Sequence, residues 1–275
     1  MLGTRTWAES LNATVCGNGS RWMVLGHGFG TDQTSWAPQL PGLLRDGRRI
    51  LRYDLAGATA LTQAAFHAER HRNLFGFAED LLMLARELGV TDAVYVGHSL
   101  GAMVGMLAAN AQPGLFSRII AIGASARYVD DPDDGYVGGL GRGEAEAMLA
   151  GMSSNYVAWA NGFARAAVGT QGAGFGASEF TDCLLALRPD IALGLLRATL
   201  LSDHREDVRR LGTALYVIAA DPDPVVPAPA ARWLAEQGRA RRLLWIDAHG
   251  HFPHMTQPER VAEALGECLR DPDDA

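Results

Sequence analysis

Lysine is absent from this 275-residue chain, and all 24 of its basic residues are arginine. Without lysine there is no lysine Schiff base, which excludes the usual pyridoxal phosphate enzymes and Schiff-base aldolases. P-loop nucleotide sites and kinase sites are excluded as well, because each needs a lysine beside the phosphates. The chain is rich in alanine, glycine and arginine. We attribute the missing lysine to a GC-rich genome, but the exclusions hold whatever the cause.

Cysteine is also scarce. Cys16, Cys183 and Cys268 are far apart and form no C-x-x-C pair, so neither a zinc ribbon nor a redox motif is indicated. We expect reduced thiols in a cytoplasmic protein. Residues 1–20 lack the basic and apolar regions of a signal peptide. Because no apolar run is long enough to cross a bilayer, we expect no membrane association.

A strong charge of one sign is missing too. The 24 basic and 31 acidic residues give a net charge of −7, and the arginines are scattered along the chain. A nucleic-acid surface needs clustered basic residues, so we expect no nucleic-acid partner. The hydrophobic content of 48% and the charged content of 20% are ordinary for a globular protein.

Short apolar runs rich in β-branched and aromatic residues recur along the chain and predict buried strands. Helical patterns lie between them, the clearest of which covers residues 73–88. This alternation favours an α/β fold with a mostly parallel central sheet covered by helices. We expect one or two antiparallel edge strands before residue 22. The predicted strands are 22–25, 50–53, 93–96, 118–122, 215–218 and 243–246, and further helices are predicted at 100–111 and 258–269.

The alternation stops between residues 124 and 210, where helical patterns follow one another without a strand. Such an insertion is most simply a cap over the carboxyl ends of the strands, where α/β folds bind ligands. We therefore predict a core of residues 1–123 and 211–275 and a helical cap of residues 124–210. Its predicted helices are 143–152, 154–168, 178–187 and 189–202.

The sequence Gly97-His98-Ser99-Leu100-Gly101 matches the G-x-S-x-G pattern and stands between a predicted strand and a predicted helix. A nucleophile elbow needs this context, because a tight turn flanked by glycines lifts the serine hydroxyl clear of the sheet. The amide of Leu100 then lies at a helix N-terminus, where it can stabilise an oxyanion. The alternative interpretation is a tight glycine turn with an idle serine.

A second glycine-rich loop, Gly26-His27-Gly28-Phe29-Gly30, follows the first predicted strand of the core. In folds with a nucleophile elbow this loop supplies the second oxyanion amide, here that of Phe29. A dinucleotide-binding loop is the competing interpretation, but the spacing is G-x-G-x-G rather than G-x-G-x-x-G. We expect His27 to brace the loop rather than to act as a base.

A serine nucleophile needs a base, and the base needs a carboxylate that holds its tautomer. Asp223 follows the predicted strand at 215–218 and stands four residues before Pro227, where the acid of a D-x-x-V-P pattern belongs. We predict Asp223 as this carboxylate and treat Asp221 as a turn residue before a proline.

Three histidines follow the last predicted strand, and His251 in the G-H-x-P context is our predicted base. The spacing of His249, His251 and His254 on a Gly/Pro loop is not that of a helix-based metal site, so we expect no metal and no cofactor. We expect His249 and His254 to support the site or to edge its pocket. The order Ser99, Asp223, His251 is that of the α/β-hydrolase fold.

The segment that begins at Gly26 resembles the G-H-G-F-G-T-D-Q segment of the RsbQ-type hydrolases, a family that includes a bacterial stress regulator and the plant strigolactone and karrikin receptors. The similarity extends through the predicted cap, so the chain is identified as a bacterial member of this family. The matching segments include Arg52-Tyr53-Asp54, Ala102-Met103-Val104-Gly105, Gly123-Ala124-Ser125-Ala126-Arg127-Tyr128, Ser154-Asn155-Tyr156, Gly162-Phe163-Ala164 and Leu187-Arg188-Pro189-Asp190-Ile191.

The resemblance implies a four-helix, V-shaped cap over a deep apolar pocket beside Ser99 and His251. Its pocket positions map to Phe29, Tyr128, Leu140, Trp159, Phe163 and Leu200. The chain departs from the family where Leu100-Gly101 follows the nucleophile and where Leu140 and Leu200 replace phenylalanine. These departures bear on the ligand rather than on the predicted catalytic residues.

The predicted function is a serine hydrolase of the carboxylesterase or lactonase type, with a triad of Ser99, Asp223 and His251. Its predicted substrate is a small apolar ester or lactone, for example a butenolide. The alternative is a ligand-sensing protein with slow hydrolysis, for which the resemblance implies a protein partner at the cap surface.

Overall fold

The computed structural model describes residues 5–169 and 175–271. In this part of the chain, one sheet has the strand order β1-β3-β2-β4-β5-β6-β7, and every neighbouring pair is parallel except β1 with β3. The predicted α/β-hydrolase fold is thus confirmed, with one antiparallel edge strand at its start. The strands are β1 Thr14–Cys16, β2 Trp22–Gly26, β3 Arg49–Tyr53, β4 Ala93–His98, β5 Phe116–Ile122, β6 Ala214–Ala220 and β7 Arg242–Ile246.

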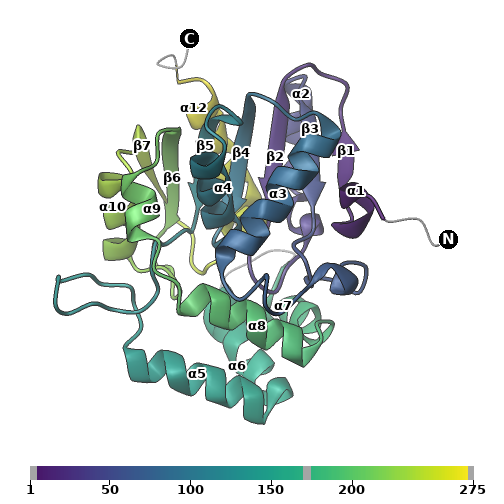
Figure 1. The fold of residues 1–275 in the computed structure, drawn as a ribbon. Helices are drawn as coiled ribbons and strands as arrows, with labels where there is room; N and C mark the ends of the chain where they lie inside the picture. Colours follow the sequence, from purple (N-terminus) through teal and green to yellow (C-terminus); the bar gives the residue numbers. More distant parts are fainter. Residues whose placement is uncertain (1–4, 170–174, 272–275) are drawn as a thin grey trace.

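Helices surround this sheet and connect its parallel strands (Figure 1). Those before and between the first five strands are α1 Trp7–Ser10, η1 Gln33–Trp36, α2 Leu40–Arg45, η2 Gln63–Ala65, α3 Leu74–Leu88 and α4 Leu100–Ala111. Those after β5 are α5 Arg142–Ser154, α6 Tyr156–Val168, α7 Ala177–Leu185, α8 Pro189–Leu200, α9 Arg205–Arg209, α10 Ala228–Gln237, α11 Pro253–Thr256 and α12 Pro258–Leu269.

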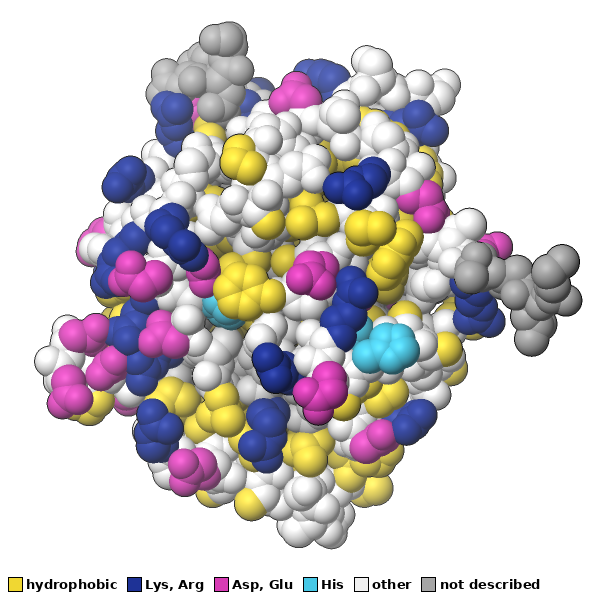
Figure 2. All heavy atoms as spheres, in the orientation of Figure 1, with side chains coloured by type: hydrophobic (Ala, Val, Ile, Leu, Met, Phe, Trp, Pro, Cys, Tyr) yellow, Lys and Arg dark blue, Asp and Glu magenta, His cyan; other side chains and the backbone are white. Residues whose placement is uncertain are grey.

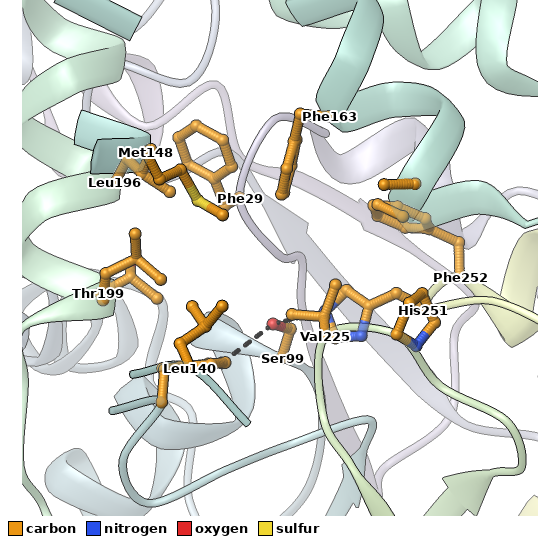
Figure 3. A pocket seen from close by; sticks show the side chains of 15 residues that line it. Phe29, Ser99, Leu140, Met148, Phe163, Leu196, Thr199, Val225, His251 and Phe252 are labelled. Carbon is orange, nitrogen blue, oxygen red and sulfur yellow. Dashed lines mark hydrogen bonds between the residues drawn. The ribbon is translucent and has the colours of Figure 1, made fainter. Parts of the chain in front are cut away.

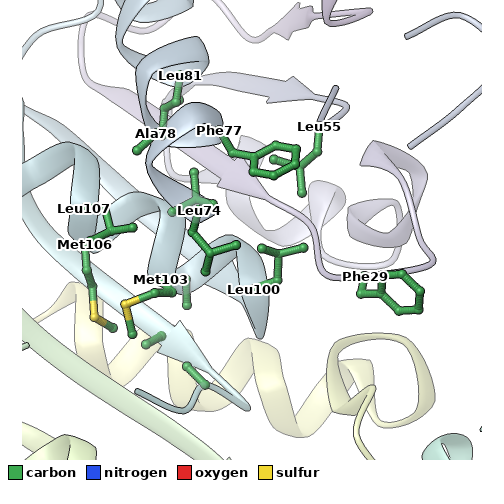
Figure 4. Close-up of a cluster of buried hydrophobic side chains, with 14 of the residues drawn as sticks. Phe29, Leu55, Leu74, Phe77, Ala78, Leu81, Leu100, Met103, Met106 and Leu107 are labelled. Atoms are coloured by element: carbon green, nitrogen blue, oxygen red, sulfur yellow. The ribbon is translucent and has the colours of Figure 1, made fainter. Parts of the chain in front are cut away.

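The central strands are buried on both faces, because successive side chains point to opposite sides of the sheet. On β6, Leu215 and Val217 join the larger hydrophobic cluster, which contains α3, α4 and α10 residues, whereas Tyr216 and Ile218 join a second cluster with α12 residues. Nearly continuous apolar runs are therefore the expected sequence pattern for these strands. Figure 4 shows part of the larger cluster, where α3 and α4 side chains meet Leu55.

Helix α3 illustrates how local sequence sets an element's ends. The Asn73 side chain accepts a hydrogen bond from the Phe75 amide and caps the first turn. At the other end, Gly89 adopts φ 65°, a left-handed conformation that suits glycine at a helix terminus. Between these ends Phe77 and Leu81 bury one face against the sheet. The boundaries predicted from the apolar spacing therefore hold to within one residue.

Helices α5 to α8 lie together beyond the end of the sheet at which β4 leads into α4 (Figure 1). We call these four helices the α5–α8 layer. Helix α6 packs against α5 and α7, and α5 packs against α8. The bounds of all four agree closely with the helices predicted for residues 143–202. The division into core and cap at residues 124 and 210 stays a prediction.

The segments that enter and leave the α5–α8 layer lie side by side. Arg127 pairs with Asp203 in an antiparallel bridge, and their side chains form a 2.9 Å ion pair. Asp131 binds both Arg127 at 2.6 Å and Arg205 at 2.7 Å. This network holds the two segments at one point, and a domain boundary near each of them is consistent with it.

On the face shown in Figure 2, arginine and acidic side chains are interspersed. Cys16, Cys183 and Cys268 are free thiols. Among the helices of residues 5–169 and 175–271, none combines the length and the apolarity that a membrane crossing needs.

Candidate active site

Ser99 lies in a sharp turn between β4 and α4. Its backbone has φ 51° and ψ −123°, a conformation that few residues other than glycine adopt readily. The turn is tight enough that a Cβ atom at Gly97 would lie 2.5 Å from Ala102 Cα. At Gly101 it would lie 2.4 Å from the His27 carbonyl oxygen. The two glycines of the motif are thus required by close backbone approach, as the sequence predicted.

Three side chains from separate loops meet at this turn, those of Ser99, Asp223 and His251. His251 Nε2 lies 2.9 Å from Ser99 Oγ, and His251 Nδ1 lies 2.8 Å from Asp223 Oδ2. All three residues are buried. When Nδ1 carries the proton and donates it to the carboxylate, Nε2 is free to accept the serine hydroxyl hydrogen. The geometry is that of a nucleophile, a base and an orienting acid.

Asp223 and its neighbour Asp221 differ in burial and in hydrogen bonding. Asp223 is buried, and its Oδ1 accepts hydrogen bonds from the amides of Val225 at 2.8 Å and Val226 at 3.1 Å. These bonds fix the carboxylate while Oδ2 faces His251. Asp221 is exposed to solvent instead. The structure therefore brings Asp223, and not Asp221, into contact with the predicted base.

The amides of Phe29 and Leu100, predicted to stabilise an oxyanion, have no hydrogen-bond partner among the described residues. Leu100 is the first residue of α4, so its N–H has no acceptor within the helix. The loop of Phe29 is braced by His27, whose Nε2 accepts from the Leu55 amide at 2.9 Å and whose Nδ1 donates to the Gly28 carbonyl at 2.8 Å. Burial lowers the pKa of His27, which keeps this bracing ring neutral.

Tyr128 adds a polar group that faces the serine. Its hydroxyl lies 3.2 Å from Ser99 Oγ, and the ring is buried. Burial raises the pKa of Tyr128 to about 12, so the phenol keeps its proton at neutral pH. A protonated phenol can donate a hydrogen bond to a ligand oxygen near the serine.

A cavity of about 110 Å³ opens beside Ser99 and His251 between the sheet and the α5–α8 layer (Figure 3). Its walls are mostly apolar. Five of the six predicted pocket residues line it, which are Phe29, Tyr128, Leu140, Phe163 and Leu200. The cavity is thus a mostly apolar space beside Ser99.

Trp159, the sixth predicted residue, is not among the residues around this cavity, and its place in the pocket stays a prediction. Its ring stacks on Phe163, with the ring centroids 5.0 Å apart and the planes at 10°. It also meets the edge of Phe29 at 6.3 Å. Trp159 therefore stands one turn of α6 before Phe163 and packs against two rings of the cavity wall.

Several lining residues were not predicted: Met148, Ala166, Ala167, Leu196, Thr199, Pro224, Val225 and Phe252. A signal for some of them exists in the sequence. On α6 and α8 the lining positions follow the i, i+3, i+4 spacing of one helix face, so Phe163 and Leu200 could have identified their helical neighbours. Pro224 and Val225 follow the predicted acid directly in the sequence, but nothing in a sequence says that a loop wraps over a cavity.

The two histidines near His251 lie outside the cavity. His249 is exposed, and the buried His254 ring packs between Trp36 at 4.8 Å and His98 at 4.4 Å. In the described ranges, no group of three or more histidine, cysteine and acidic side chains has the arrangement of a metal site. After the glycine-rich loop, the next helical turn is the short η1, which begins three residues after Gly30. No helix therefore opens at the last glycine, as a dinucleotide-binding loop would require.

Comparison with known proteins agrees with this architecture. The model of the alpha/beta hydrolase family matches residues 23–264. A strigolactone esterase of Pisum sativum is 38% identical over 258 residues, which cover 94% of this chain and 96% of the relative. The Karrikin insensitive 2 receptor CA of Petunia hybrida is 33% identical over 258 residues, 94% of each chain.

A solved structure of a hydrolase from Oleispira antarctica has the same fold, with a TM-score of 0.91 and 25% identity over 96% of both chains. The resemblance found in the sequence to the strigolactone and karrikin receptor-like hydrolases is therefore confirmed. The alignments extend through the α5–α8 layer as well as the sheet, because they cover nearly the whole chain. The protein belongs to the alpha/beta hydrolase family and is a hydrolase.

Proposed function

We propose that the protein is a serine esterase or lactonase in which Ser99 is the nucleophile. Ser99 Oγ attacks the substrate carbonyl while His251 Nε2 accepts its proton, and Asp223 stabilises the resulting imidazolium. The amides of Phe29 and Leu100 hold the oxyanion of the tetrahedral intermediate. His251 then returns the proton to the leaving alcohol, and an acyl group remains on Ser99. Water, activated by the same histidine, releases the acid.

The observation that carries this proposal is the continuous chain of hydrogen bonds from Asp223 through His251 to Ser99 at the floor of an apolar cavity. Ser99 lies in a tight turn, and the amide of Leu100 directly after it has no acceptor within its helix. Each part has a role in acyl transfer, and an idle serine would need none of them.

The cavity also limits the proposed substrate class. It has room for a small molecule, and its lining offers carbon surface except at Ser99, Tyr128, Thr199 and His251. A charged substrate would lose its hydration there without gaining a partner, because no arginine or carboxylate lines the cavity among the described residues. We therefore propose a small apolar ester or lactone. The related protein of Pisum sativum is itself named an esterase.

The test is the substitution Ser99→Ala, assayed with p-nitrophenyl acetate and p-nitrophenyl butyrate. We expect hydrolysis to fall to the uncatalysed rate while the thermal unfolding midpoint is kept. A fluorophosphonate should label the parent protein and leave Ser99→Ala unlabelled. Turnover retained in Ser99→Ala would overturn the proposed mechanism.

A second candidate function is ligand sensing with slow hydrolysis. The observation that favours it is the 33% identity to a karrikin receptor over 94% of each chain, including the α5–α8 layer. In this case the layer would bind a partner protein once a butenolide-like ligand is bound. Turnover distinguishes the two functions: a metabolic enzyme completes many rapid cycles on its ester. A sensor releases product slowly and binds its partner only in the presence of ligand.

A further inference from the structure

His98 stands directly before Ser99, at the last position of β4, and its ring is fully buried. Its Nε2 lies 2.7 Å from the main-chain carbonyl oxygen of His251. Burial, reinforced by the neighbouring His254 and His251, lowers the pKa of His98 well below the ordinary value. The ring is therefore neutral and carries one proton. Because a carbonyl oxygen can only accept, that proton must be on Nε2.

The same ring also supports the loop that carries the Phe29 amide. A Cβ atom at Gly28 would lie 2.5 Å from His98 Nδ1, so the loop backbone rests on the ring at a position where only glycine fits. Gly28 is the residue directly before Phe29. One side chain thus contacts the loop of one predicted oxyanion amide and lies next in sequence to the nucleophile.

The main chain of His251 is held at both of its polar groups. Its N–H donates to the Ala167 carbonyl of α6 at 2.8 Å, and its carbonyl accepts from His98. The preceding residue, Gly250, donates to the Pro222 carbonyl at 3.0 Å. Within this set, His98 supplies the sole side-chain hydrogen bond to the backbone of the described residues 250 and 251. It is also the bond that joins the base to the strand of the nucleophile.

We propose that His98 is a positioning residue for the hydrolysis described above: its Nε2–H bond to the His251 carbonyl fixes the base relative to Ser99 and to the Phe29 loop. This inference rests on the proposed function, since it assumes that Ser99 and His251 react with substrate. His98 touches neither substrate nor the reacting atoms. It acts by holding the distance between Ser99 Oγ and His251 Nε2, which proton transfer requires to be near hydrogen-bond length.

His254 offers a matched control, because it is a buried histidine in contact with the same ring. Its ring centroid is 4.4 Å from that of His98. Both of its ring nitrogens lack a partner among the described residues, so the ring contributes packing and no hydrogen bond. A substitution at His254 therefore tests what disturbance of this part of the core does by itself.

The experiment compares His98→Leu, which removes the donor, with His98→Gln, whose side-chain amide can present an N–H at a position similar to that of Nε2. His98→Asn is polar but one bond shorter, so it cannot reach the carbonyl. His254→Phe is the packing control. Each variant is assayed for kcat and KM with p-nitrophenyl acetate, and the rates are divided by the active sites counted with a fluorophosphonate.

We expect His98→Leu and His98→Asn to lower kcat by about 10²-fold, because a displacement of about 1 Å in a catalytic group costs that much. KM should stay within about twofold, since the cavity lining is unchanged. His98→Gln should recover most of kcat, and His254→Phe should keep it. If His98→Leu does not fold, the comparison of Gln with Asn decides the question alone.

Equal kcat values for the Gln and Asn variants would overturn the inference, and so would a loss confined to KM or to the unfolding midpoint. A kcat loss in His254→Phe as large as that of His98→Asn would assign the effect to packing and would overturn it too. Ser99→Ala in the same assay separates this result from the proposed function. If Ser99→Ala is inactive while every His98 variant is fully active, the inference fails and the serine mechanism stands.

Discussion

The carboxyl end of the sheet and the α5–α8 layer meet at one cavity, but they are built differently. On the sheet side, Ser99, Asp223 and His251 are held by directional hydrogen bonds, and the turn of Ser99 is flanked by two positions where only glycine fits. On the layer side, Phe163 and its neighbours contribute apolar surface and stacked rings. Directional bonds fail when an atom moves by a fraction of an ångström, whereas apolar packing adapts. We therefore expect chemistry to depend on the sheet side and ligand fit on the layer.

One contact crosses this division. The His251 amide donates to the Ala167 carbonyl, which lies in the last turn of α6. A helix end leaves its final carbonyls without partners in the helix, and here one of them is satisfied by the loop of the predicted base. The layer thus contributes one polar anchor to the site in addition to its apolar wall.

Removal of the Asp223 carboxylate should have the largest effect on catalysis. Asp223→Asn should lower kcat by about 10³–10⁴-fold, because an amide beside Nδ1 favours the wrong tautomer of His251. Asp221→Asn, two positions away and exposed, should leave kcat within about twofold. Steady-state kinetics on both variants provide the measurement. Equal losses in the two would mean that the hydrogen bond from His251 to Asp223 is not used.

A pair of glycines tests the difference in packing. Gly101→Ala should destabilise the fold by about 3 kcal/mol, since its Cβ would meet the His27 and Gly26 carbonyl oxygens at 2.4 and 2.6 Å. Gly162→Ala, at an exposed position of α6 with open space around it, should stabilise by about 1 kcal/mol. Urea unfolding of the two variants measures both changes. A stabilising effect at Gly101 would contradict the close approach.

Ligand fit should respond to changes in the α5–α8 layer. Phe163→Ala removes a ring from the cavity wall and should raise KM about tenfold for an apolar ester, which corresponds to roughly 1.4 kcal/mol of lost contact. The value of kcat should stay within about threefold, because the hydrogen bonds at Ser99 are untouched. Val157→Ala, on an exposed position of the same helix, is the control. A loss in kcat with constant KM would assign Phe163 to the chemistry instead.

The smallest expected effect is a loss of folding stability at low pH. Residues 124–203 contain no histidine, whereas the core contains several buried ones. Burial lowers the pKa of His254 from 6.5 to about 3. Between these two pH values the unfolded chain therefore binds a proton at His254, whereas the native protein does not. The free energy of unfolding should therefore fall as the pH drops below 6.5.

The share of His254 in this loss should be about 1 kcal/mol between pH 7 and pH 5.5. His254→Phe should make the free energy of unfolding less dependent on pH over that interval, because it removes the titrating ring. Chemical denaturation of both proteins at several pH values provides the comparison. Identical slopes would show that His254 is solvated in the native state.

The local sequence pattern was enough to predict most helices and strands. Helices α4 and α12 begin and end where the sequence predicted, because a glycine elbow and a Pro258 start mark them clearly. The strands were predicted two to three residues short in places, as for β6, since apolar residues flank the run at both ends. The candidate Ser99, Asp223 and His251 came from motif spacing and chain order, and these three residues meet in space.

Other features were not accessible to sequence reasoning. Trp159 and Phe163 are one helical turn apart and both were expected in the pocket, and only the placement of α6 over the cavity makes Phe163 a lining residue. The bond from His98 to the His251 carbonyl joins residues 153 positions apart and uses a backbone atom that every residue has. No residue pattern signals such a bond.

The sequence by itself determined the parallel sheet, the elbow and the absence of lysine chemistry, because each follows from residue types at short range. Tertiary structure decided which rings form the cavity and which side chain joins the nucleophile to the base. These choices depend on how loops of distant segments close on one another. Loop closure is set by packing and hydrogen bonds across the whole fold rather than by neighbours in the chain.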